Sequence, residues 1–409
     1  MIARFFSYTR KFDKNLWVLS AGWFVSALGF ALSIPFISIY FNARLGLSIT
    51  EVGIFFGVMA IVRAIFQGIG GEISDRIDRR SILIFAQGAR SVALLMIAIA
   101  IGFDWGFWAV AGFLVVSSIF GAVFQPIANA MVSDILPENL RLDGYAITRS
   151  AMNLGWAVGP ALGGLMAARS YASLFIAASI VTLFASLLFL FFLKPVPYER
   201  AKDKFRFKDI IALKNDRIFL THSVLTFILF IVVAQLIAPF SVYAVQIVGL
   251  SELELGYLFA ANGLLVGFCQ LPVTRLLSGI KMTTQLAIGA VLYAIGYTLV
   301  GAVNGFWFLM MALVVVTMGE LAISPPSITL ASRLAPKGQM GRYMGVYGFM
   351  MASGWSFGPL YGGIILDNFA FNSPLLAWAA ISSLAVVAAV GYLMFQRKIS
   401  DDINRPRIT

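Results

Sequence analysis

Inside one long apolar segment lies the run GWAVGPALGG, which extends from Gly155 to Gly164. A second copy, GWSFGPLYGG, extends from Gly354 to Gly363 in another apolar segment. Glycine and proline are unfavourable inside a helix, so their return at matching places indicates a purpose. Glycine lets a neighbouring helix approach closely, and proline bends a helix. The repeated run predicts close-packed, bent helices at equivalent positions of a duplicated chain.

The composition indicates a protein that lies in a membrane. Of the 409 residues, 60% are hydrophobic and 12% are charged, against about 45–50% and about 25% in a soluble domain. Segments in lipid must pair their backbone groups internally, which favours helices of about 20 residues. We expect twelve such helices, over about residues 15–41, 49–71, 80–102, 106–131, 142–168, 172–193, 217–246, 253–277, 281–303, 306–332, 341–366 and 374–396.

Basic residues predict how the chain is oriented in the membrane. Of the 30 lysines and arginines, only Arg44 and Arg169 fall in loops that a cytoplasmic N-terminus places outside. Arg63, Arg90 and Arg149 fall within spans, and the others lie in inside segments. The positive-inside rule therefore predicts that both termini lie in the cytoplasm. We expect the membrane to be the inner membrane of a prokaryote. The net charge of +11 reflects this orientation and contact with anionic membrane lipids, so we expect no nucleic-acid partner.

The spans divide into two sets of six at the charged break between Lys194 and Asp216. We expect an N-terminal six-helix bundle over 1–193, a cytoplasmic linker over 194–216 and a C-terminal six-helix bundle over 217–409. An amphipathic surface helix and a plain linker are equally open for the break. The repeat includes a second pair of matches, since Gly46-Leu47-Ser48 corresponds to Gly249-Leu250-Ser251. An even number of spans in each copy predicts a parallel pseudo-twofold repeat.

The residue inventory excludes most enzyme chemistry. Cys269 and His222 are single copies of their types, so we expect no disulfide, metal site or Cys/His nucleophile. No phosphate-binding GxxxxGK[ST] loop is present in the sequence, which argues against ATP as the energy source. We therefore expect no enzyme activity and no cofactor. We expect His222, near the cytoplasmic end of its span, to be solvated or to cap a helix, with a proton relay as the alternative.

A second motif joins the second and third spans. The turn reads GEISDRIDRR from Gly71 to Arg80 and is dense in charges of both signs. Asp134, at the inside end of the fourth span, is a candidate partner for one of these arginines. The residues alone leave two readings open, a network that joins helix ends and a solvated turn.

The turn resembles the Gly-x-x-x-Asp-Arg-x-Gly-Arg-Arg signature of the major facilitator superfamily. The run from Gly155 resembles the antiporter motif of its drug:proton antiporter branch, and the likeness covers the whole chain. The resemblance implies alternating access by rocking of the two bundles. It also implies a latch to the start of the eleventh span in the outward-open state, formed by Gly71, Asp75, Arg76, Arg79, Arg80 and Asp134. The helix bend of the antiporter motif would lie at Gly155, Gly159, Pro160, Gly163 and Gly164.

The chain departs from the family pattern in three places. Asp78 replaces the second glycine of the turn signature, and its charge is expected to loosen or rewire the latch. The fourth span offers Gln125 and Asn129 where the branch often carries an arginine. No acidic residue lies between Leu16 and Phe41 in the first span, where the branch often has one. The proton-coupling residues of the branch therefore do not transfer directly.

Ionisable residues at membrane depth are functional candidates because they are costly in lipid. Glu320 lies near the middle of the tenth span with Thr317 and Ser324 on the same face. We consider it a proton-binding site or a structural partner of a buried arginine. Arg63 and Arg90 are candidates for binding an anionic group, with internal hydrogen bonding as the alternative. Further candidates for the substrate cavity, or for hydrogen bonds between helices, are Gln125, Asn129, Gln235, Asn262 and Gln270.

The function that fits best is proton-coupled antiport, which exports amphiphilic or lipophilic compounds as in multidrug efflux. A monomer with a small-molecule substrate, a proton gradient as energy source and lipid contacts is expected. The alternatives are a symporter or uniporter of an anionic metabolite, with Arg63 and Arg90 as ligands, and a lipid or lysolipid translocase. A channel or sensor of the same fold is a further alternative, and the duplicated bend motifs argue against it.

Overall fold

The computed structural model describes residues 12–74, 77–137, 140–196, 216–302, 304–336 and 339–405, and these residues contain helices but no strand. By compactness the chain divides into unit 1, Met1–Ile37 with Val62–Lys202, and unit 2, Ser38–Ile61 with Asp203–Thr409. The end of the first span and the start of the second thus pack with the C-terminal helices. The expected surface helix within 194–216 lies outside the described residues for most of its length.

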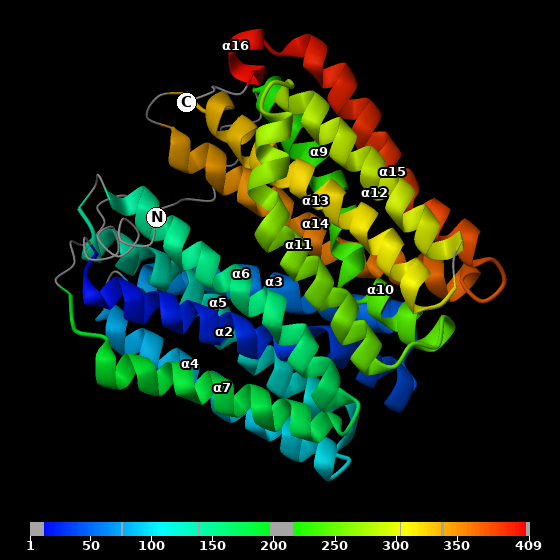
Figure 1. The fold of residues 1–409 in the computed structure, drawn as a ribbon. Coiled ribbons are helices and arrows are strands. Elements are labelled where there is room, and N and C mark those ends of the chain that lie inside the picture. Colours follow the sequence, from blue (N-terminus) through cyan, green and yellow to red (C-terminus); the bar gives the residue numbers. More distant parts are fainter. Residues whose placement is uncertain are drawn as a thin grey trace. The chain divides into compact units, whose positions relative to one another are not determined.

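The first half of the chain forms one helix for each expected span (Figure 1). The bounds are α2 (Lys14–Ile39), the π-helix η1 (Tyr40–Arg44), α3 (Ile49–Ser74), α4 (Arg79–Gly102), α5 (Gly106–Ile135), α6 (Arg141–Ala167) and α7 (Tyr171–Phe192).

The second half repeats this order, with one span built from several short helical segments. The bounds are α9 (Arg217–Val233), the 3-10 helix η4 (Ala234–Leu236), α10 (Pro239–Val242), the π-helix η5 (Tyr243–Ile247), α11 (Glu252–Leu277), α12 (Met282–Ala302), α13 (Phe306–Leu334), α14 (Met340–Phe369), α15 (Pro374–Phe395), the 3-10 helix η6 (Gln396–Lys398) and α16 (Asp401–Asn404).

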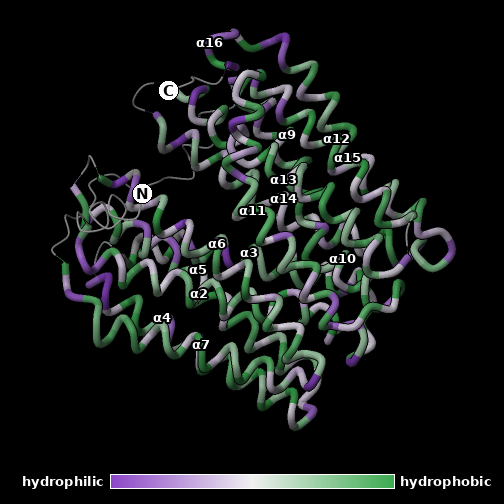
Figure 2. Tube along the Cα trace, in the orientation of Figure 1, coloured by the Kyte–Doolittle hydropathy of each residue, from purple (hydrophilic) through white to green (hydrophobic). Residues whose placement is uncertain are grey.

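The helices confirm an all-α membrane protein. Within the described residues, 10 helical segments are long and apolar enough to cross a bilayer, and α6 and α14, which carry the glycine runs, are not among them. Figure 2 shows hydrophobic residues along α4 and α7 and hydrophilic residues in α16. The predicted number of twelve crossings is consistent with this set, since each expected span is occupied by helix.

The same turn appears after the first helix of each half. Gly46 and Gly249 have φ values of 71° and 81°, which glycine adopts without strain. Each follows a π-helix, η1 or η5. In each copy the backbone N–H of the next serine, Ser48 or Ser251, donates to the carboxylate of the glutamate three residues later, at 2.8 Å in both cases. Local geometry therefore repeats where the sequence repeats.

Helix pairings recur as well. In unit 1, α4 packs against α5 and α7, and in unit 2, α12 packs against α13 and α15. The helix that carries each glycine run packs against the first helix of its half, α6 against α2 and α14 against α9. Equivalent helices thus have equivalent neighbours in each unit, as a duplication predicts.

The glycine runs allow this close approach. In unit 1, a Cβ atom at Gly155 would lie 2.6 Å from the carbonyl oxygen of Phe24, and one at Gly159 would lie 2.6 Å from the Cβ of Ala31. Neither position has room for a side chain. The close packing predicted from the first glycine run is confirmed, and the bend at Pro160 remains a prediction.

The second run behaves in the same way within unit 2. A Cβ at Gly354 would lie 2.6 Å from the carbonyl oxygen of Phe227, and one at Gly358 would lie 2.7 Å from that of Ile231. Gln235 joins these helices, because its Nε2 donates to the carbonyl oxygen of Gly358 at 2.8 Å. The glycines therefore bring backbone within reach of a buried amide.

One contact in unit 2 joins residues that are far apart in the sequence. The carboxylate of Asp367 on α14 accepts from the backbone N–H groups of Ile49 at 3.0 Å and Thr50 at 2.7 Å. These groups open α3 and have no partner within the helix. A Cβ at Gly53 would lie 2.5 Å from the carbonyl oxygen of Pro359, so the backbones also meet closely. Asp367 therefore caps a helix of the other half of the sequence.

Candidate functional site

The acid at span depth in unit 2, Glu320, is half-buried and is held by neutral groups. Glu320 lies in the middle of α13, where its Oε2 accepts from Nδ2 of Asn262 at 3.3 Å. The same Nδ2 donates to Oγ1 of Thr317 at 2.9 Å. The structure thus brings together three predicted residues from α11 and α13. Within the described residues, Glu320 forms no ion pair.

Two tyrosines complete the surroundings of this acid. Tyr293 and Tyr297 on α12 are both at most 2% exposed and lie within electrostatic reach of Glu320. The Tyr297 hydroxyl has no hydrogen-bond partner in the part of the chain described. Sequence reasoning missed both residues, although their i,i+4 spacing places them on one helix face.

The two bases at span depth in unit 1, half-buried Arg63 and buried Arg90, share one aromatic ring. The Cζ atoms of Arg63 and Arg90 each lie 5.3 Å from the centroid of the Phe30 ring. Nη1 of Arg90 also donates to Oγ of Ser26 at 3.3 Å, and Nε2 of Gln87 donates to the same oxygen at 2.9 Å. Sequence reasoning missed Gln87, which lies three residues before Arg90 and therefore on the same face.

The other predicted cavity residues have different roles. Gln235 and Gln270 both donate to backbone carbonyl oxygens of other helices, Gly358 and Leu321, so they act between helices. Across the described chain, no hydrogen bond joins the remaining predicted side chains to either group of buried charges; these are Gln125, Asn129 and Ser324.

The turn between α3 and α4 contains a buried ion pair. Arg79 is 7% exposed and pairs with Asp134 at the end of α5, so the predicted partnership within unit 1 is confirmed. Arg80 donates from Nε to the carbonyl oxygen of Leu193 at 2.5 Å, which satisfies an acceptor just beyond α7. Gly71 lies within α3, and Asp75 and Arg76 lie outside the described residues.

Asp78, the departure from the family signature, caps a helix. Its Oδ2 accepts from the backbone N–H of Ser81 at 2.9 Å and from the Ser81 hydroxyl at 2.8 Å. A carboxylate at this position accepts a hydrogen bond from an N–H group that has no partner within the helix, and it is attracted by the positive end of the helix dipole. The extra charge therefore stabilises the start of α4.

His222 corrects one expectation. The side chain is 0% exposed, so the prediction of a solvated histidine is wrong. Its ring stacks on Tyr347 and Phe395, with centroids 5.9 and 6.3 Å away, and its Nε2 lies 3.1 Å from the carbonyl oxygen of Ser327. Aromatic side chains from α14 and α15 close over a position that span depth alone had placed near water.

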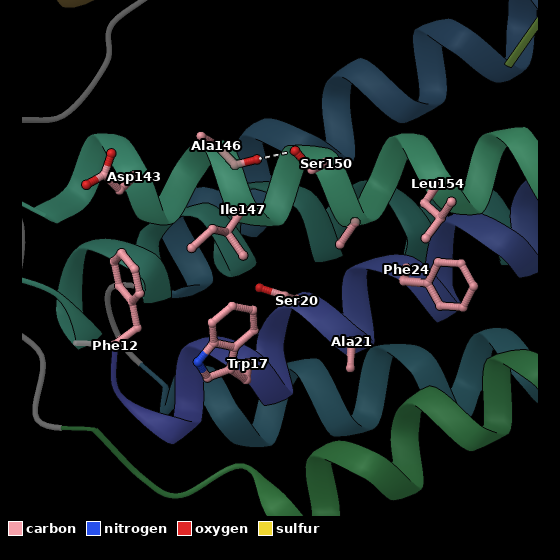
Figure 3. Close-up of a pocket in the computed structure, with 11 residues that line it drawn as sticks. Phe12, Trp17, Ser20, Ala21, Phe24, Asp143, Ala146, Ile147, Ser150 and Leu154 are labelled. Atoms are coloured by element: carbon pink, nitrogen blue, oxygen red, sulfur yellow. Dashed lines mark hydrogen bonds between the residues drawn. The ribbon is translucent and has the colours of Figure 1, made fainter. Parts of the chain in front are cut away.

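A separate hollow of about 620 Å³ lies in unit 1 between α2 and α6 (Figure 3). Its lining is mostly apolar, with Trp17 and Phe24 on α2 facing Ile147 and Leu154 on α6. Asp143 is its acidic lining residue. No predicted cavity residue contributes to this lining, so the hollow is distinct from the buried charges.

Comparison with known proteins gives the family. The model of the Major Facilitator Superfamily matches residues 19–359 and 225–407. A Na(+), Li(+), K(+)/H(+) antiporter of Planococcus maritimus is 22% identical, covering 94% of this chain and 96% of that protein. The quinolone resistance protein NorA of Staphylococcus aureus (strain MSSA476) is 22% identical, covering 92% and 95%.

A solved structure shares the fold. A bacterial homolog to the human lysosomal transporter Spinster has a TM-score of 0.75 at 16% identity, covering 94% of this chain and 97% of that chain. The family match spans the repeated glycine runs, the charged turn and both groups of buried charges. The chain is therefore a transporter, not an enzyme, and it belongs to the Major Facilitator Superfamily.

Proposed function

We propose that this chain is a proton-coupled antiporter that exports amphiphilic or lipophilic compounds by alternating access. The proposal rests on Glu320, a carboxylate at span depth whose described contacts are neutral. One of these contacts is the amide of Asn262, at 3.3 Å. Protonation of this carboxylate removes a charge that is costly in an apolar environment, and it breaks no ion pair among the described residues. A group in this setting suits a carrier that takes up a proton and releases it.

The names of two relatives support antiport. One is a Na(+), Li(+), K(+)/H(+) antiporter and the other is a quinolone resistance protein. The first name includes proton exchange, and the second concerns resistance to a drug class. At 22% identity, the substrate and the coupling ion of this chain belong to the proposal.

The remaining predicted residues have conformational roles in this proposal. The Arg79–Asp134 pair anchors a cytoplasmic latch, and the helix bend of the antiporter motif lets α6 rock on α2. Both termini lie in the cytoplasm, and the monomer is the transporting species. The other members of the two groups are Gly71, Asp75, Arg76 and Arg80 in the latch and Gly155, Gly159, Pro160, Gly163 and Gly164 in the bend.

Transport by proteoliposomes with an acidic interior tests the proposal. The panel contains lipophilic cations, amphiphilic anions and neutral amphiphiles, together with Na⁺. We expect the outward proton gradient to drive uptake of at least one lipophile. Glu320→Gln should abolish that uptake, because the amide cannot carry a proton. Asp402→Asn is the matched control, since Asp402 lies exposed on α16.

Three results would contradict the proposal. The first is uptake that ignores the proton gradient and survives Glu320→Gln. The second is accumulation of a metabolite anion only when protons move in the same direction, which would identify symport. The third is exchange of Na⁺ with no lipophile transported.

A further inference from the structure

A single aromatic ring in unit 1 holds two cations. The guanidinium carbons of Arg63 on α3 and Arg90 on α4 each lie 5.3 Å from the centroid of Phe30 on α2. This distance is within the range of a cation–π attraction. Arg90 is 5% exposed. Three helices thus place two positive charges around one ring at span depth.

Among the described residues, these two charges have no acidic partner. Neither arginine forms an ion pair within the described residues, and the two positive charges are close enough to repel each other. Buried charges are normally paired or neutralised. The acidic side chains described in unit 1 lie in loops or near helix ends: Asp13, Asp78, Asp104, Asp134 and Asp143. Unit 1 therefore holds positive charge at span depth that none of its described carboxylates is placed to balance.

Several N–H donors around the ring have no hydrogen-bond partner among the described residues. Nε of Arg90 is buried without a hydrogen-bond partner among the described residues, and Arg90 donates through Nη1 to Ser26 at 3.3 Å. Across the same described residues, Arg63 forms no hydrogen bond. A guanidinium presents five N–H donors in a planar fork that matches two oxygens of a carboxylate or phosphate. The site offers charge and donors to an oxyanion and an apolar ring to its carrier.

We propose that Arg63 and Arg90 bind the anionic group of the transported amphiphile, a carboxylate, sulfonate or phosphate. The inference rests on the proposed function and adds a substrate class to it, amphiphiles that carry an oxyanion. Phe30 keeps the two guanidinium groups together. Gln87 is a positioning residue, because it shares the Ser26 hydroxyl with Arg90.

Binding to the unmodified chain in phosphatidylcholine nanodiscs tests the substrate class. Octanoate, octyl phosphate, octyltrimethylammonium and octanol share one alkyl chain and differ in the head group. We expect both anions to bind about tenfold or more tightly than the cation and the alcohol, as charge-assisted hydrogen bonds imply. Equal or tighter binding of the cation or the alcohol would overturn the inference.

Variants test the residues. Arg63→Gln and Arg90→Gln should each weaken octanoate binding about tenfold or more. Arg149→Gln is the matched control and should leave binding unchanged, since Arg149 is an exposed arginine of unit 1. Arg90→Lys keeps the charge without the planar fork and should weaken binding less than Arg90→Gln. Unchanged affinity in both glutamine variants, or an equal loss in Arg149→Gln, would refute the assignment, and melting temperatures identify variants that do not fold.

Competition separates the possible sources of the anion. The octanoate titration is repeated with inorganic phosphate in solution and in nanodiscs that contain phosphatidylglycerol. We expect neither to displace octanoate. Displacement by phosphate would identify a site for free ions, and displacement by phosphatidylglycerol would identify a site for lipid head groups. Either result would overturn the inference.

The binding and transport experiments test the anionic substrate class and the proposed antiport separately. The binding assay contains no proton gradient, so retained anion preference without proton-driven transport would refute only the proposed antiport. Proton-driven transport confined to cations would refute only the anionic substrate class.

Discussion

Single residues give each unit its own electrostatic character. At span depth, unit 1 carries Arg63 and Arg90 on one ring, and unit 2 carries Glu320 beside Asn262. Both groups rely on neutral partners within the described residues. Arg79, by contrast, is paired with Asp134. We therefore regard the charges at span depth that form no ion pair among the described residues as the ones available to a ligand or a proton.

Asp367 supplies a test at the residue scale. Replacing it by alanine removes the acceptor for the N–H groups of Ile49 and Thr50, and loss of a helix cap costs about 1 kcal/mol. We expect faster hydrogen exchange at the start of α3. The neighbouring Asn368→Ala is the control, because among the described residues the Asn368 side chain bonds within its own helix, to the carbonyl oxygen of Ile364. Equal exchange in both variants would show that Asp367 does not hold this end.

At the scale of elements, the helices with the glycine runs act through backbone contact. Gly358 on α14 meets Ile231, whereas Gly348 on the same helix has nothing within 4 Å of an added Cβ. A valine therefore fits at one position and not at the other. Forced overpacking costs about 1–3 kcal/mol, and valine is no worse than glycine as a helix former.

The matched pair Gly358→Val and Gly348→Val tests this contact. We expect Gly358→Val to lower the thermal unfolding temperature in detergent and Gly348→Val to leave it unchanged or slightly higher. Two equal decreases would show that the close contact of Gly358 with α9 does not determine the cost of adding a side chain to α14.

Over the whole molecule, duplication organises the structure. The turns at Gly46 and Gly249 share positive φ values, and α4 and α12 have equivalent neighbours. These features were predictable, because lipid forces each span to be helical and because short local motifs determine local geometry. The helix ends agree with the expected spans to within a few residues, because hydropathy indicates where a helix enters and leaves the lipid.

Contacts between distant residues were not predictable. Hydropathy indicates which residues leave water but not which neighbour they meet. It therefore gave no sign that Asp367 caps α3, that two arginines lie 5.3 Å from the ring of Phe30, or that aromatic rings enclose His222. Polar residues were recognisable as candidates from depth alone. Only the tertiary structure separates them into amides that join helices, such as Gln235, and a carboxylate without an ion pair among the described residues, Glu320.

Coupling between substrate and proton is the central claim, and proton movement driven by a substrate gradient measures it most directly. Proteoliposomes hold a pH-sensitive dye and receive a transported amphiphile outside, with no initial pH difference. The account predicts that substrate entry drives protons out, so the interior becomes alkaline, and that Glu320→Gln removes this change. Substrate entry with a constant internal pH in the unmodified protein would contradict it.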